Sequence, residues 1–139
     1  MSDETTLTKT FEFSSSHRYF RPEWTQEENE RVFGACAFPN GHGHNYLLDV
    51  TVKGAVDPVT GMVVNIVDVK KVVEDVLEEF DHQHLNHDTP YFRDRIPTSE
   101  NLAVTLWTLI SPRLPSGSTL VGVLLREDEN LAVKYRGGV

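Results

Sequence analysis

The sequence predicts an α+β domain in which an antiparallel sheet carries helices on one face. Period-two alternation of apolar and polar residues near both ends of the chain indicates strands, and two apolar stripes at helical spacing between them indicate helices. No internal repeat, low-complexity tract or linker is visible, so we treat residues 1–139 as a single domain. The expected order is strand, strand, helix, helix, strand, strand, which gives a four-stranded antiparallel sheet with two helices on one face.

The first two strands come from the N-terminal third of the chain. Residues 7–15 alternate apolar and polar side chains, which predicts a strand that runs into His17. A charged, irregular segment follows, in which we expect a helical turn around residues 27–32. Asn40-Gly41 is a strong turn signal. In the strand after it, alternate residues share one face, which would carry His42, His44, Tyr46, Leu48, Val50 and Val52.

Both helices are predicted from their caps and apolar stripes. Asn65 is placed to cap the first helix, and Thr98 to cap the second, which Pro112 would end. The first stripe comprises Val69, Val72, Val73, Val76, Leu77 and Phe80, and the second comprises Leu102, Ala103, Leu106 and Ile110. Residues 119–126 and 131–135 then predict a terminal hairpin. Because a four-stranded sheet has two exposed edges, we also expect an oligomer that pairs them.

Composition narrows the class of function. A formal net charge of −8 argues against nucleic acid as a partner, because phosphate neutralisation needs a basic face. No apolar run approaches membrane-spanning length, and the first residues lack the basic and apolar regions of a signal peptide, so we expect no membrane association. The single cysteine, Cys36, cannot form an internal disulfide, which favours a reducing compartment, the cytoplasm. A small anionic substrate held by a local group of arginines remains compatible with this charge.

Three histidines predict a metal site. His42 and His44 project from the same face of one strand, and antiparallel pairing would bring His17 beside them. Three imidazoles with one open position are typical of catalytic zinc. The alternative is a chance His-x-His pair whose rings bond to backbone, and other transition metals also accept imidazole. A cupin-type iron site would need a glutamate a few residues further on, which this sequence lacks.

Cys36 has three interpretations: a fourth metal ligand, a buried apolar side chain or a catalytic base. A base would need a nearby positive charge or a hydrogen-bonded relay, and Asp81 and His82 at the end of the first helix could form such a relay. Their alternative role is helix C-terminal chemistry, and His82 with His84 and His87 could also make a second metal site.

Glu127 ends the third expected strand on its apolar parity. From spacing alone we expect its side chain to be exposed at the strand tip. If it were instead partly buried, its carboxylate would suit two adjacent N–H groups of a planar heterocycle.

Six stretches, in their order and spacing, resemble the 6-pyruvoyltetrahydropterin synthase family. They are "SSSHRY", "FGACAFPNGHGHNY", "DPVTGMVVN", "FDHQHLN", "PTSENLAV" and the terminal "RE…N", and the resemblance runs from Phe11 to Gly137. It implies the tunnelling fold, ββααββ, in which rings of three subunits form a barrel and two rings stack. A homohexamer, a dimer of trimers, is therefore expected.

The resemblance also implies roles for individual residues. His17, His42 and His44 would bind one Zn²⁺ per subunit, and Cys36 would be the general base with Asp81 and His82 of a neighbouring subunit as its relay. Glu127 would anchor the pterin ring, helped by Thr98, Ser99 and Glu100. The implied reaction converts 7,8-dihydroneopterin triphosphate to 6-pyruvoyltetrahydropterin and triphosphate, as in tetrahydrobiopterin biosynthesis; a Mg²⁺ ion on the triphosphate is left open.

Two alternatives stand beside this reading. The same fold belongs to 6-carboxytetrahydropterin synthase of the queuosine route, whose cysteine typically lies closer to the His-x-His pair than Cys36 does. A non-catalytic pterin-binding module would use zinc structurally, with Cys36 as the fourth ligand. One departure from the family is Ala35, where a lysine is common, so the triphosphate would depend on arginines: Arg18, Arg21, Arg31, Arg93 and Arg95 are unranked candidates.

Overall fold

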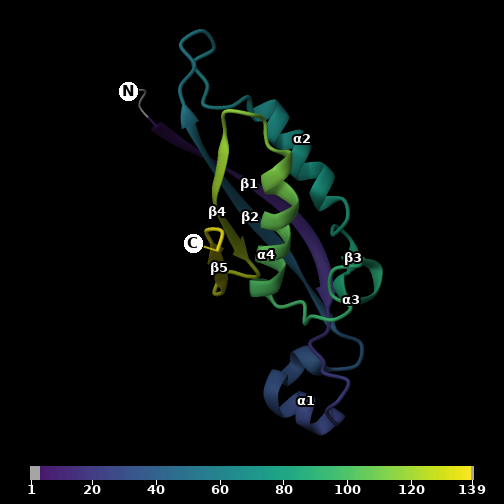
Figure 1. The fold of residues 1–139 in the computed structure, drawn as a ribbon. Coiled ribbons are helices and arrows are strands. Elements are labelled where there is room, and N and C mark those ends of the chain that lie inside the picture. The colour runs from purple at the N-terminus through teal and green to yellow at the C-terminus, as the bar shows by residue number, and fades with distance from the viewer. Residues whose placement is uncertain (1–3, 139) are drawn as a thin grey trace.

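The computed structural model describes residues 4–138, which form a sheet with two long helices on one face and a smaller helical segment beyond the sheet's end (Figure 1). The strands are β1 (Glu4–His17), β2 (His42–Ala55), β3 (Gln83–His84), β4 (Thr119–Arg126) and β5 (Ala132–Tyr135). The helices are α1 (Gln26–Phe33), α2 (Ile66–Leu77), α3 (Leu85–Asp88) and α4 (Ser99–Ile110), with short 3₁₀ turns η1 (Gly34–Ala37) and η2 (Ser111–Arg113).

The sheet has five strands in the order β3-β1-β2-β4-β5. The four predicted strands are confirmed, and each neighbouring pair among them is antiparallel. The prediction of a four-stranded, wholly antiparallel sheet is nevertheless wrong, because β3 adds a fifth strand that pairs in parallel with β1 at Ser15 and Ser16. Two residues are too few to show period-two alternation, so this strand left no pattern in the sequence. The segment that leads into β3 is attached to β1 by the Asp81 carboxylate, which accepts a hydrogen bond of 2.8 Å from Ser14 N.

Both long helices begin at the predicted caps. The Asn65 side chain accepts a hydrogen bond from Val67 N at 2.9 Å, and Thr98 Oγ1 accepts one from Asn101 N at 3.1 Å. These bonds satisfy amide groups that have no partner within the helix. The apolar stripes of α2 and α4 pack on the sheet face that carries Phe13, Leu48 and other buried side chains of β1 and β2.

The segment after β1 is more ordered than the sequence indicated. Instead of one helical turn, α1 extends from Gln26 to Phe33, capped by Thr25, which accepts from Glu28 N at 3.0 Å. Asn29 is fully buried and fastens the helix to the preceding loop: its side chain accepts from Arg21 N at 2.7 Å and donates to Arg21 O at 3.1 Å. The β1–β2 connection is therefore a small folded unit at the end of the two longest strands, where Figure 1 shows α1.

Among residues 4–138, none of the helices combines the length and the apolar character that crossing a membrane would require.

Candidate metal and active site

The three histidines lie close together where β1 ends and β2 begins, at the base of the connection that contains α1. The register pairs His17 with His42 and Ser15 with His44. The ring centroids of His17 and His42 are 4.9 Å apart, and each of these rings lies 5.1 Å from that of His44. The structure thus brings together the three side chains that the sequence predicted, because strand pairing and alternation place them on one face.

Two imidazole nitrogens in this cluster are buried without a partner. His17 Nδ1 lies 2.9 Å from the Tyr46 hydroxyl, whereas His17 Nε2 and His44 Nε2 have no hydrogen-bond partner. A buried polar group left unpaired costs about 1–3 kcal/mol, so these nitrogens call for a ligand. The Tyr46 contact fixes the orientation of the His17 ring, as outer partners of metal-bound histidines do.

The donor atoms form two overlapping groups that could hold a cation. One comprises His17, Cys36 and His42, and the other His17, His44 and Glu127; within each group all ligand atoms lie within 4.8 Å of one another. His17 belongs to both groups. The three histidines that the sequence predicted as one ligand set do not form a group by themselves, because His42 and His44 belong to different groups. Nitrogen, sulfur and carboxylate donors at this spacing are the ligands that zinc takes, so both groups are compatible with zinc.

Cys36 lies beside the histidines, in the 3₁₀ turn after α1. Its Sγ atom is 3.7 Å from His42 Nε2, and its carbonyl accepts a hydrogen bond of 2.8 Å from Tyr19 N. Partial burial, and then the charge of Glu127, raises the pKa of this thiol. The protein surroundings of Cys36 therefore favour the protonated thiol. A nearby positive charge would be needed to ionise it.

The Glu127 side chain is largely buried, contrary to the exposure that its position at the end of a strand predicted. It follows β4 directly, but its side chain is only 11% exposed and lies 3.6 Å from His44 Nε2, measured from Oε1. The same oxygen accepts hydrogen bonds from Ser99 Oγ at 3.2 Å and from the Tyr19 hydroxyl at 3.4 Å. The expected exposure at the strand tip is wrong, because the start of α4 and the loop after β1 cover this end of the sheet.

The three residues predicted to help Glu127 have different surroundings. Ser99 is buried and contacts Glu127, as described above. Thr98 uses its hydroxyl to cap α4, and the Glu100 side chain is exposed. Among Thr98, Ser99 and Glu100, it is the Ser99 side chain that hydrogen-bonds to the Glu127 carboxylate.

Tyr19 is a site residue that the sequence reasoning missed. Its ring centroid is 4.7 Å from that of His17, and burial followed by the charge of Glu127 raises the pKa of its phenol. The hydroxyl therefore stays protonated and donates to Glu127. The residue lies just beyond the last strand position, in the irregular segment, so no periodicity pointed to it. Its place directly after His17-Arg18 was the available signal.

Asp81 and His82 form a pair, but not with the thiol of their own chain. Asp81 Oδ1 is 3.0 Å from His82 Nδ1, and the Ser14 backbone amide, followed by His82, lowers the pKa of Asp81. The His82 side chain is 80% exposed and lines a hollow of about 430 Å³ that His44 also borders. Within residues 4–138, no hydrogen bond or ion pair joins either residue to Cys36, whose side-chain partner is His42.

Within the described residues, the alternative second metal site lacks a set of three ligands, although His84 Nδ1 is buried without a hydrogen-bond partner. The rings of His84 and His87 stack with centroids 4.2 Å apart. Neither belongs to a three-ligand group in the part of the chain that the structure describes.

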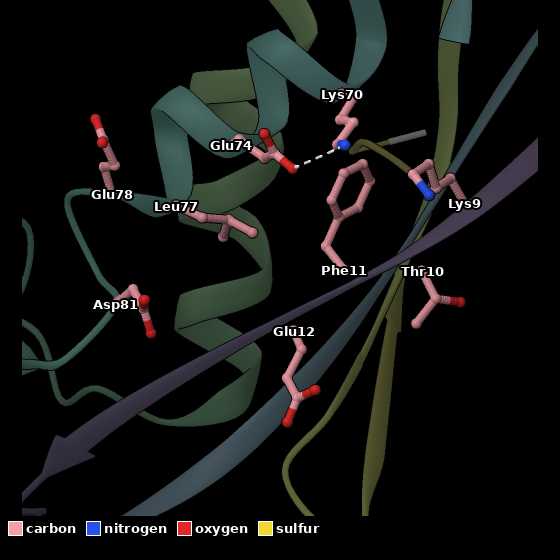
Figure 2. Close-up of a pocket in the computed structure, with 9 residues that line it drawn as sticks. All are labelled: Lys9, Thr10, Phe11, Glu12, Lys70, Glu74, Leu77, Glu78 and Asp81. Carbon is pink, nitrogen blue, oxygen red and sulfur yellow. Dashed lines mark ion pairs between the residues drawn. The ribbon is translucent and has the colours of Figure 1, made fainter. Parts of the chain in front are cut away.

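A separate groove of about 380 Å³ lies between β1 and α2 and suits an anionic substrate poorly. Figure 2 shows the residues that line it, which include two lysines, Lys9 and Lys70, and four carboxylates, among them Asp81. One of the lysines, Lys70, is already paired with Glu74 at 4.0 Å. The histidine cluster, rather than this groove, is the candidate active site.

The burial of His17 predicts how the metal-free protein responds to acid. Desolvation, and then the charges of His44 and His42, lowers the pKa of His17 from 6.5 to about 3. Between these values the unfolded chain binds a proton that the folded chain does not, so stability is lost as the pH falls. After metal removal with a chelator, we expect the free energy of unfolding to fall from pH 6.5 towards pH 3, by up to about 1.4 kcal/mol per pH unit from this group.

Urea unfolding at several pH values would measure this slope. A His17→Gln variant should lose the same contribution and show a flatter profile, whereas His87→Ala should keep the contribution of His17, because His87 is exposed and is not among the groups that lower the pKa of His17. Equal slopes in the parent protein and in His17→Gln would contradict the assignment.

Comparison with known proteins agrees with the fold and the site. A family model described as 6-pyruvoyl tetrahydropterin synthase matches residues 6–138. The 6-pyruvoyl tetrahydrobiopterin synthase of Pongo abelii is 45% identical over 132 residues, which are 94% of this chain and 90% of that protein. The solved 6-pyruvoyl tetrahydropterin synthase structure of Caenorhabditis elegans superposes with a TM-score of 0.93 at 33% identity, covering 99% of this chain and 98% of that one. A putative 6-carboxy-5,6,7,8-tetrahydropterin synthase of Archaeoglobus fulgidus is 35% identical over 95 residues, or 68% of this chain and 75% of that protein. The chain therefore belongs to the 6-pyruvoyl tetrahydropterin synthase family.

Proposed function

We propose that the protein is a zinc-dependent 6-pyruvoyltetrahydropterin synthase, a carbon–oxygen lyase acting on phosphates. It would convert 7,8-dihydroneopterin triphosphate to 6-pyruvoyltetrahydropterin with release of triphosphate. One observation carries the proposal: unpartnered buried imidazole nitrogens, the Cys36 thiol and the largely buried carboxylate of Glu127 lie close together in one place. The curated relatives named as 6-pyruvoyl tetrahydrobiopterin synthases support this activity.

Each residue would have a distinct task. His17, His42 and His44 would hold the metal, with the His17 ring oriented by Tyr46. When bound, Zn²⁺ would act as a Lewis acid that acidifies the substrate's side-chain hydroxyls and lowers the pKa of the adjacent thiol. Cys36 Sγ would then accept a proton from the substrate side chain, because it lies 3.7 Å from a metal-binding imidazole.

Glu127 would bind the pterin ring. Its carboxylate would accept the two adjacent N–H groups of the heterocycle, which suits a bidentate, charge-assisted contact. The hydroxyls of Tyr19 and Ser99 both donate to Oε1, so the carboxylate is oriented before substrate arrives. Thr98 would support this contact by fixing the start of α4, and Glu100 would border the ring.

The relay would come from a second copy of the chain. Asp81 and His82 are paired with each other, and the His82 side chain is exposed. Neither residue has a hydrogen bond or ion pair with Cys36 of the same chain. We propose a homohexamer, a dimer of trimers with the barrel of the tunnelling fold, in which this pair reaches the Cys36 of a neighbour. We further propose that residues 1–139 act as a single domain and that the protein works in the cytoplasm. A Mg²⁺ ion would accompany the triphosphate of the substrate.

Two other functions have an observation in their favour. A 6-carboxytetrahydropterin synthase is supported by the Archaeoglobus fulgidus relative, although the match covers less of the chain than the pyruvoyl relatives do. A non-catalytic, zinc-stabilised pterin-binding module is supported by the group of His17, Cys36 and His42, in which the thiol itself could bind the metal. We favour the pyruvoyl synthase, because five residues separate Cys36 from His42, as in that branch of the family.

Product identity distinguishes the three functions. Purified, zinc-loaded protein would be incubated with 7,8-dihydroneopterin triphosphate and its products analysed by mass spectrometry. Release of triphosphate with all carbon atoms retained on the pterin is the expected result. Loss of a two-carbon fragment would identify the carboxy type, and zinc-loaded protein without turnover would favour the binding module.

A further inference from the structure

A cavity of about 540 Å³ lies at the end of the molecule where Figure 1 shows α1 and α3. Three segments build it: the chain after β1, residues 86–87 of α3, and the loop before α4. Four arginines, Arg18, Arg21, Arg93 and Arg95, line it together with two carboxylates, Glu23 and Asp94. The aromatic rings of Phe20 and Phe92 contribute its apolar wall.

The charge of this cavity is opposite to that of the chain. Four guanidinium groups face two carboxylates here, in a protein of formal net charge −8. The groove between β1 and α2 has two lysines and four carboxylates, and the hollow beside His82 is lined by no lysine, arginine or carboxylate. Of these three hollows in residues 4–138, the arginine cavity is the one suited to a multiply charged anion.

The arginines are held in place with donors to spare. Arg18 donates to Ala37 O at 3.0 Å and to Gln26 Oε1 at 2.6 Å, and its guanidinium lies over the Phe20 ring. Arg95 donates to Thr105 Oγ1 at 2.6 Å. A guanidinium has five N–H donors, so each of these side chains keeps donors free. Such fixed, planar donors match phosphate oxygens in pairs.

The wall of the cavity continues into the candidate metal site. Arg18 follows His17 directly, and Asn86 of the cavity clamps it by accepting from Arg18 N and donating to Arg18 O, each at 2.8 Å. Gly41, with φ of 65°, packs so close to the His17 carbonyl that a Cβ atom there would collide with it. The segment that carries His17 and the arginine cavity are therefore neighbours in the structure.

From this position and charge we infer that the arginine cavity binds an oligophosphate group, the triphosphate of the substrate and of the released product. The identity of the ligand rests on the proposed function, whereas the preference for an oligophosphate rests on the cavity itself. Arg21 and Arg93 are exposed, and neither guanidinium donates to an uncharged protein group, although that of Arg21 lies 3.3 Å from the Glu23 carboxylate. They should contribute affinity without contacting the reacting atoms.

Titration calorimetry with inorganic triphosphate tests the inference on zinc-loaded protein. The double variant Arg21→Gln/Arg93→Gln should bind triphosphate at least about tenfold more weakly than the parent protein, as expected for the loss of two charge-assisted contacts. The control is Arg31→Gln, because Arg31 is exposed on α1, paired with Glu28 and outside the cavity; it should bind within about twofold of the parent. All three proteins keep the histidines, so direct contact of triphosphate with zinc contributes equally.

Kinetics separates this inference from the proposed function. With dihydroneopterin triphosphate, the double variant should raise KM about tenfold and leave kcat within about twofold. Unchanged triphosphate affinity and unchanged KM in the double variant would overturn the inference and leave the lyase proposal standing. Arginine-dependent binding of triphosphate by a protein that turns over no dihydropterin would refute the lyase proposal while supporting an oligophosphate site.

Discussion

A Cys36→Ala variant is expected to keep its zinc and to lose catalytic activity, with kcat lowered by about 10²–10⁴-fold, the usual contribution of a general base. The thiol lies 3.7 Å from His42 Nε2, close enough to the metal site for a bound substrate to reach it. The fold should be unaffected, because the side chain is only partly buried and its backbone carbonyl, not its sulfur, anchors Tyr19. Steady-state kinetics and zinc content by atomic absorption would be measured on the same preparation.

Cys36→Ser is the matched control for size. It should keep zinc and remain strongly impaired, since a hydroxyl is a far weaker acid than a thiol. Loss of zinc from Cys36→Ala would make the thiol a metal ligand, and unchanged turnover would exclude it as the base.

A His17→Ala variant is expected to lose both zinc and activity. His17 belongs to both groups of candidate ligands and is completely buried, so its removal disrupts either mode of binding and leaves a cavity in the protein. Zinc stoichiometry should fall from about one per chain to near zero, with turnover lost in parallel.

Two variants show whether this effect is specific. Tyr46→Phe removes only the hydroxyl that contacts His17 Nδ1 and should weaken zinc binding about 10–100-fold, the usual effect of losing an outer partner. His87→Ala changes an exposed histidine outside both ligand groups and should keep full zinc content. Retention of zinc by His17→Ala would contradict the proposed site.

The two helix starts and the meeting of the histidines could be predicted because short-range rules govern them. Asn65 and Thr98 cap their helices through side chains that reach amides two or three residues ahead. The convergence of His17 with His42 and His44 follows from strand alternation plus a single antiparallel pairing. Neither inference needed knowledge of the remaining sheet.

Glu127 and Tyr19 show where such rules stop. The strand pattern placed Glu127 at a tip, but its burial depends on α4 and on the loop after β1, which approach from distant parts of the sequence. Tyr19 lies outside any periodic segment, and its contact with Glu127 spans 108 positions of the chain. Periodicity and capping depend on residues that are close in the sequence, so they do not predict contacts between distant segments.

The sequence by itself determined the four antiparallel strands, the two long helices, the family and the proximity of the three histidines, because each follows from local periodicity, capping or a compact motif. Only the tertiary structure decided the parallel strand β3, the burial of Glu127 and the arginine cavity. These features arise where segments far apart in the chain pack against one another, and the free energy that fixes them comes from those contacts rather than from any one segment.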